Sequence, residues 1–154
     1  MIDAEKDIRF MHEAIDEAKI AAYMGEVPIG CVITKGDLVI ARTHNLRENR
    51  NDPTAHAEVL ALRAAGAVMG GRRLGETTLY VTLEPCPMCM SAIMLSGICR
   101  LVFGASDPEF GAVNSHWNMA HDPAFKHDIC VTGGVEVEIC SDLIMEFFES
   151  ARSK

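Results

Sequence analysis

The stretch TTLYVTLEPCPMC, residues 77–89, passes from a β-rich run into two closely spaced cysteines, with a proline directly before the first and another two residues before the second. Thr, Tyr and Val favour a strand, and proline is common in the first turn of a helix. We therefore predict a strand over residues 77–84 and a buried helix from Cys86 to about Ser96. Cys86 and Cys89, at positions i and i+3, then lie on the same helix face.

A second segment, DPTAHAE at residues 52–58, has the same design. A helix is expected from about Thr54 to Ala67, with His56 and Glu58 in its first turn. In the middle of a helix two such residues would point in nearly opposite directions. At the open end of a helix both can turn inward, so that one binds a metal and the other reaches a water molecule bound to it.

His56, Cys86 and Cys89 together form a candidate catalytic zinc site. Thiolates are favoured at the positive end of a helix dipole. Three protein ligands leave a fourth position for water, which distinguishes a catalytic zinc from a closed structural one. The alternatives are a redox-active Cys-x-x-Cys pair, or a structural zinc closed by a fourth ligand such as His44 or Cys31.

Length and composition predict one globular domain over residues 1–154. Apolar residues make up 49% of the chain and charged residues 23%. The sequence has no run that approaches the roughly 18 apolar residues of a membrane span, and its start does not resemble a signal peptide. We therefore expect a cytoplasmic protein that does not insert into membranes.

The formal net charge of -8 argues against a broad basic surface for nucleic acid. Charge is nevertheless uneven along the chain. Arg42, Arg47 and Arg50 fall within nine residues, whereas residues 135–150 contain five acids and no Lys or Arg. A polyanion is expected to approach the first of these regions.

The remaining elements are predicted from hydrophobic period and turn signals. We expect an N-terminal helix over residues 3–24, with one buried stripe. After it we expect a hairpin over residues 27–45, a strand over 99–105, a long loop with a short helix from 106, a strand over 129–132 and a helix over 137–151. The predicted stripe comprises Ile8, Met11, Ile15 and Ala18. Alternating strands and helices imply an α/β fold with a sheet between helices.

Several residues are assigned to the core or surface by default. Cys31, Cys99, Cys130 and Cys140 stand among apolar residues and are expected to be buried thiols. Trp117 is expected to pack in the core or at a dimer interface. We expect His116, His121 and His127 on loops or the surface.

Five motifs in order along the chain resemble the tRNA adenosine deaminase branch of the cytidine deaminase-like superfamily. They are EVPIG at 26–30, HN at 44–45, DPTAHAE at 52–58, TLYVTLEPCPMC at 78–89 and VFGASD at 102–107. The pairing of His-x-Glu with Pro-Cys-x-x-Cys is the signature of zinc-dependent nucleobase deaminases. The resemblance implies a three-layer α/β/α fold with a five-stranded mixed sheet, and a homodimer.

The resemblance also implies a role for each matching residue. His56, Cys86 and Cys89 would hold one Zn²⁺ per chain, Glu58 would shuttle protons, and Asn45, the Ala57 amide and the main chain near Glu84 would bind the base. The implied reaction is hydrolytic deamination of adenosine to inosine at the wobble position, in the anticodon loop of tRNA. In the family, a C-terminal pair matching Phe147 and Phe148 helps to hold the RNA.

The sequence departs from this branch where RNA phosphates would be expected to bind. Glu109 stands near the place of a common lysine, Lys126-His127 replaces an Asn-His pair, and the C-terminal helix has few basic residues. A free nucleobase deaminase acting on guanine, cytosine or a related heterocycle is therefore the alternative function. A third hypothesis is a catalytically idle subunit that binds RNA or an active deaminase.

Overall fold

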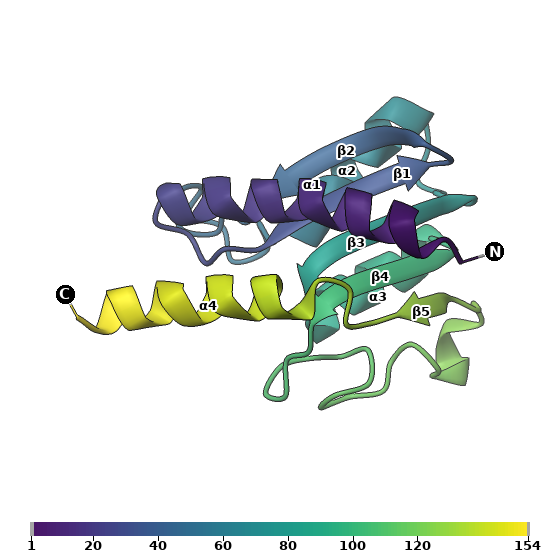
Figure 1. Ribbon diagram of the computed structural model, residues 1–154. Coiled ribbons are helices and arrows are strands. Elements are labelled where there is room, and N and C mark those ends of the chain that lie inside the picture. The colour runs from purple at the N-terminus through teal and green to yellow at the C-terminus, as the bar shows by residue number, and fades with distance from the viewer. Residues whose placement is uncertain (1, 154) are drawn as a thin grey trace.

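The computed structural model describes residues 2–153 and contains a five-stranded sheet with the order β2-β1-β3-β4-β5. Strand β1 is antiparallel to β2 and β3, whereas β3, β4 and β5 are parallel to one another. The strands are β1 (Gly30–Lys35), β2 (Leu38–His44), β3 (Thr77–Leu83), β4 (Arg100–Ala105) and β5 (Cys130–Thr132) (Figure 1). The predicted mixed sheet is confirmed.

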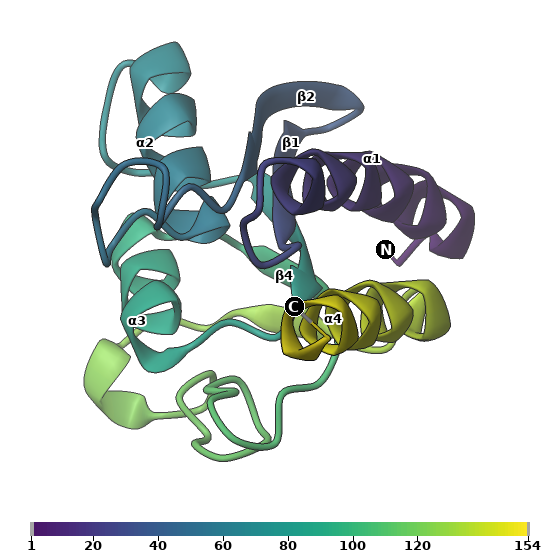
Figure 2. The same ribbon diagram turned by 90° about the vertical axis from the view of Figure 1, so that its left-hand side faces the viewer.

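Helices cover both faces of the sheet, as Figure 2 shows. On one face lie α1 (Ala4–Tyr23) and α4 (Val137–Arg152), and on the other lie α2 (Ala57–Met69) and α3 (Pro87–Ser96). A 3₁₀ helix, η1 (Pro123–Phe125), interrupts the long segment between β4 and β5. The expected three-layer α/β/α arrangement is therefore confirmed.

Alternate side chains along a strand pack into two different cores, because successive side chains point to opposite faces of a sheet. Ile33 and Val81 belong to the core under α2 and α3, while Val32 and Tyr80 belong to the core under α1. All four are at most 1% exposed. The central strands β1 and β3 are therefore buried on both faces and hold the two helical layers together.

The predicted stripe of α1 is wrong at one position. Ile8 is 42% exposed, and Asp7 is buried in its place. The Asp7 carboxylate accepts two hydrogen bonds from Arg100 on β4, both of 2.6 Å, and one from the Tyr80 hydroxyl. An ion pair with a distant strand therefore accounts for a buried charged residue on a helix face where hydrophobicity alone favours isoleucine.

Two other assignments to the core are wrong. Cys31 and Cys140 are buried as expected, but Cys99 and Cys130 are exposed. Cys130 lies on the edge strand β5, which has a neighbour on one side only. Trp117, expected in the core or at a dimer interface, is 40% exposed on the loop between β4 and η1, so the core alternative is wrong.

Helix α2 begins three residues later than predicted. Thr54 does not enter the helix, because its hydroxyl and its backbone N–H both donate to the Asp52 carboxylate. His56 is the N-cap residue instead. Among residues 2–153, no helix is both long and apolar enough to cross a membrane.

Candidate active site

Two helix N-termini bring the three predicted zinc ligands together. His56 is the N-cap of α2, Cys86 is the N-cap of α3, and Cys89 lies in the first turn of α3. The Nδ1 atom of His56 lies 3.6 Å from the Cys86 sulfur and 3.5 Å from the Cys89 sulfur. The three donor atoms lie within 4.8 Å of one another.

These distances fit a tetrahedral zinc ion. Zn–N bonds of about 2.05 Å and Zn–S bonds of about 2.3 Å at a tetrahedral angle place nitrogen and sulfur about 3.6 Å apart. His44 does not close the site as a fourth ligand, because its ring is bound to the Glu17 carboxylate at 2.7 Å. Cys31 is not part of the ligand cluster that the described residues form.

The proton distribution among the three ligands is also suited to metal binding. A hydrogen bond from the Cys89 thiol, reinforced by His56, lowers the pKa of Cys86 to about 4. Because the Cys89 thiol donates this hydrogen bond to Cys86 and is buried, the pKa of Cys89 is raised. The hydrogen bond to Cys86 raises the pKa of His56. Binding of a cation here would displace the remaining protons.

Glu58 is a buried carboxyl group beside this cluster. It is 4% exposed, and burial is the main cause that raises its pKa to about 7. A carboxyl group with such a pKa can both accept and release a proton near neutral pH. Glu58 and the ligands His56 and Cys86 line the same pocket.

This pocket has a volume of about 780 Å³. Its walls come from the segment before β1, the loop after β2, the end of β3, the N-termini of α2 and α3, the loop after β4 and helix α4. Wall residues outside the ligand cluster include Val27, Arg47, Glu84, Glu109, Phe110, Ile144 and Phe148. The pocket is of the size that accepts a small molecule or a single nucleotide base.

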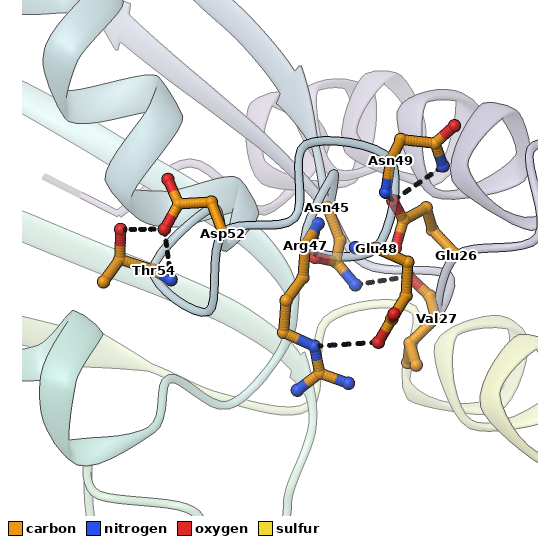
Figure 3. A network of polar contacts seen from close by, with 8 residues as sticks. All are labelled: Glu26, Val27, Asn45, Arg47, Glu48, Asn49, Asp52 and Thr54. Carbon is orange, nitrogen blue, oxygen red and sulfur yellow. Dashed lines mark hydrogen bonds and ion pairs between the residues drawn. The ribbon is translucent and has the colours of Figure 1, made fainter.

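Asn45 lies beside the pocket and is held in place by its own chain. Its side-chain nitrogen donates to the Val27 carbonyl at 3.3 Å, and its side-chain oxygen accepts from the Arg47 backbone N–H at 3.1 Å (Figure 3). Together with Val27, Arg47 and His56, it lines a small adjoining cavity. One amide hydrogen of Asn45 remains for another acceptor, since the side chain carries two.

A buried carboxylate, Glu26, fixes the loop that carries Arg47. It accepts hydrogen bonds from the Glu48 backbone N–H at 3.0 Å, and from the backbone and side-chain nitrogens of Asn49 at 2.7 and 2.8 Å. Figure 3 shows these contacts converging on Glu26. Sequence reasoning used Glu26 only as part of a motif and did not find this role.

Ala57 and Glu84 occupy different positions relative to the pocket. Ala57 is the first residue of α2, so its N–H group has no acceptor within the helix. The Glu84 side chain does not enter the pocket freely, because the loop after β4 surrounds it with hydrogen-bond donors such as the Asp107 and Ser115 N–H groups. Its main chain continues the β3 strand and bonds to Ala105.

The three clustered arginines separate in space. Arg47 lines the pocket, whereas Arg42 and Arg50 line another cavity on the far side of the loop. Arg42 also forms an ion pair with Glu13 at 3.3 Å. Of the three, Arg47 is therefore the one placed to contact a ligand in the main pocket.

Comparisons with known proteins agree with this geometry. The family model described as "Cytidine and deoxycytidylate deaminase zinc-binding region" matches residues 4–105. A protein of Bacillus subtilis (strain 168) named tRNA-specific adenosine deaminase is 45% identical over 149 residues, which cover 97% of this chain and 92% of that protein. A protein of the same name from Haemophilus influenzae is 42% identical over 154 residues, covering 99% and 89%.

Solved structures give the same picture of the fold. A structure from a study of A-to-I editing by tRNA:A34 deaminases at the wobble position of transfer RNA superposes with a TM-score of 0.85 and 41% identity. The match covers 88% of this chain and 98% of that one. A guanine deaminase from Nitrosomonas europaea shares the fold, with a TM-score of 0.78 at 23% identity, covering 89% and 81%.

Proposed function

Since this chain belongs to the zinc-binding cytidine and deoxycytidylate deaminase family, and within it to the tRNA-specific adenosine deaminases, we propose that it converts adenosine to inosine at the wobble position of tRNA. The reaction is hydrolytic and releases ammonia. The substrate is the unpaired base of an anticodon loop, since enzymes of this kind act on bases that are outside a duplex.

The arrangement of Glu58 beside the three ligands is the observation that carries this proposal. His56, Cys86 and Cys89 form one cluster, and His56, Cys86 and Glu58 line the 780 Å³ pocket. A metal ligand set with an open position next to a buried proton carrier supports hydrolysis. The identities of 45% and 42% to tRNA-specific adenosine deaminases support the choice of substrate.

Each residue then has a defined part in the chemistry. A zinc ion held by His56, Cys86 and Cys89 would lower the pKa of a water molecule, making it a nucleophile near neutral pH. The Glu58 carboxylate would take a proton from the attacking water, pass it to the ring nitrogen and assist the departure of ammonia. Burial of Glu58 keeps these transfers apart from bulk solvent.

Recognition of the purine would use groups at the helix end and the adjoining loop. The free N–H group of Ala57 points out of the first turn of α2, and Asn45 has one amide hydrogen to spare. Glu84 also lines the pocket, and its main chain would be a further contact for the base. Arg47 would contact a phosphate next to the target nucleotide, as arginine commonly does.

The decisive experiment is inosine formation in an anticodon stem-loop that carries adenosine at the wobble position. A matched stem-loop with guanosine at that position is the control, and free guanine, cytosine and adenine are tested for ammonia release. Inosine in the first RNA supports the proposal. Ammonia from a free base with the RNA unchanged refutes it.

A specific observation favours free-base deamination as the second candidate. The exposed acid Glu109 lines the pocket, together with Ile144 and Phe148 of α4. A negative charge there disfavours RNA phosphates. The hypothesis of an idle subunit has less support, because the complete set of ligands and Glu58 is in place.

We further propose that the chain forms a homodimer through the outer face of α2 and α3. Leu95 is 72% exposed and lines a cavity together with Val59, Leu62 and Ala92. Exposed apolar patches of this kind commonly mark protein interfaces. A monomer in solution, measured by sedimentation, would contradict this.

A tRNA substrate also supports the expected cytoplasmic location.

A further inference from the structure

The carboxylate of Glu84 organises the loop that follows β4, residues 106–115. The Glu84 oxygens accept hydrogen bonds from four backbone N–H groups of this loop and from one hydroxyl group. The donors are the N–H groups of Asp107 (3.1 Å), Val113 (3.1 Å), Asn114 (3.0 Å) and Ser115 (3.1 Å), and the Ser115 hydroxyl. One side chain thus accepts hydrogen bonds from four backbone N–H groups of a loop that has neither helix nor strand.

The loop closes around Glu84 without spare room. A Cβ atom added at Gly111 would lie 2.5 Å from the Glu84 carboxylate. The Gly111 N–H group donates to the Asp107 carbonyl at 2.8 Å, so the turn is also tied within the loop. Glu84 is 2% exposed and lies two residues before the ligand Cys86. The loop is therefore anchored to the strand that delivers the zinc ligands.

The anchored loop carries an exposed aromatic side chain to the rim of the pocket. Phe110 is 61% exposed and lines the pocket. Its ring meets Trp117 edge to face, with centroids 6.0 Å apart, and Trp117 meets His116 in the same way at 4.3 Å. The N–H groups of His116 and Trp117 both donate to the Gly111 carbonyl, so this aromatic group moves with the loop.

We propose that Glu84 is a positioning residue, whose carboxylate folds residues 106–115 so that Phe110 stacks on the base next to the deaminated one. This inference rests on the proposed RNA substrate, because a polynucleotide must continue past the rim once its target base is inside. Aromatic side chains hold single-stranded bases by stacking. Phe110 contacts the substrate directly, and Glu84 acts through Phe110.

A carboxylate is the group that this position requires. It has only acceptor atoms, and all its partners are donors. A glutamine would fit the space but would turn an NH₂ group toward at least one backbone N–H. The substitution Glu84→Gln therefore loosens the loop while leaving the size of the side chain unchanged.

The test compares Glu84→Gln and Phe110→Ala with the wild type, using inosine formation in the stem-loop. Both variants should raise KM for the RNA about tenfold, within the range for loss of one base-stacking contact. They should leave kcat within about threefold and zinc content unchanged. The double variant should resemble either single one, since coupled residues are not additive. The substitution Glu5→Gln at an exposed site on α1 is the matched control.

Trp117 provides an independent readout, because it is the one tryptophan of the sequence and its backbone N–H group donates to the Gly111 carbonyl of this loop. Its fluorescence should change in Glu84→Gln but not in Glu5→Gln. Ser115→Ala, which removes one donor, should give a smaller change in the same direction and guards against a variant that does not fold.

Three results would overturn the inference. These are an unchanged KM in Phe110→Ala, additive effects in the double variant, or unchanged Trp117 fluorescence in Glu84→Gln. A wild-type protein that forms no inosine but deaminates a free base would instead show that the proposed function has failed.

Discussion

Asp7 and Arg100, 93 residues apart in the sequence, meet through two hydrogen bonds of 2.6 Å in the interior. The Asp7 side chain is 3% exposed and that of Arg100 is 15% exposed. Arg100 also donates to Thr132 on β5. The pair therefore joins α1 to β4 and β5, the two strands at one edge of the sheet.

Substitution Asp7→Ala should destabilise the protein by about 3–5 kcal/mol, because it leaves a buried guanidinium without its partner. Urea unfolding followed by circular dichroism measures the change. The double variant Asp7→Leu, Arg100→Met should recover most of the loss, since apolar replacement of a buried pair is often neutral. A loss below about 1 kcal/mol in Asp7→Ala, the usual value of a surface pair, would mean that water reaches the pair.

Removal of Glu58 should abolish turnover without loss of metal. The variant Glu58→Gln keeps the side-chain volume but cannot carry a proton, so kcat should fall by at least about 10²–10⁴-fold. Zinc content, measured by atomic absorption, should stay near one per chain. Activity within tenfold of the wild type would show that another group moves the proton.

Substitution of a zinc ligand should lower the metal content as well as the activity, unlike the substitution of Glu58. In Cys86→Ser the metal content should fall together with activity, and added Zn²⁺ should restore neither at ordinary concentrations.

In the wild type, dialysis against a chelator should remove activity and added Zn²⁺ should return it. Metal uptake by the chelated protein should release protons, because Cys89 and His56 must give up theirs. Uptake without proton release would contradict this assignment of ligands.

Acid should release the loop held by Glu26. Burial by itself would raise the pKa of Glu26, but the hydrogen bonds from Asn49 and Glu48 outweigh it and lower the pKa from 4.5. A lowered folded-state pKa contributes stability that is present above about pH 4.5 and is lost as the pH falls through the folded value. The stability difference between wild type and Glu26→Gln should therefore shrink between pH 5 and the acid limit.

Urea unfolding of both proteins at a series of pH values tests this prediction. An exposed acid, changed in Glu5→Gln, is the control and should show little difference from the wild type at any pH. A constant gap between wild type and Glu26→Gln down to the lowest pH would mean that Glu26 keeps its charge throughout or contributes by packing alone.

The sequence predicted the site better than it predicted the packing around it. His56, Cys86 and Cys89 could be grouped because each stands at the start of a helix that local signals mark, and the structure brings them together. The predicted helix from Thr54 began too early because a short Asx turn at Asp52 competes for the same backbone groups.

Local patterns also failed where a residue has its partner far away in the chain. The burial of Asp7 rather than Ile8 depends on Arg100, and no local pattern contains that information. The anchoring role of Glu84 depends on donors 23 to 31 residues later. Local periodicity cannot reveal such contacts, because they form only when the sheet has assembled.

The two ends of the described chain lie on opposite sides of the molecule, which matters for anyone who attaches a tag or a second protein. Figure 1 shows α4 running out past the sheet on the side opposite to the start of α1. Ile144 and Phe148, in the later turns of α4, form part of the pocket wall. A bulky fusion after α4 would stand at the entrance to the pocket, whereas one placed before α1 leaves that entrance open.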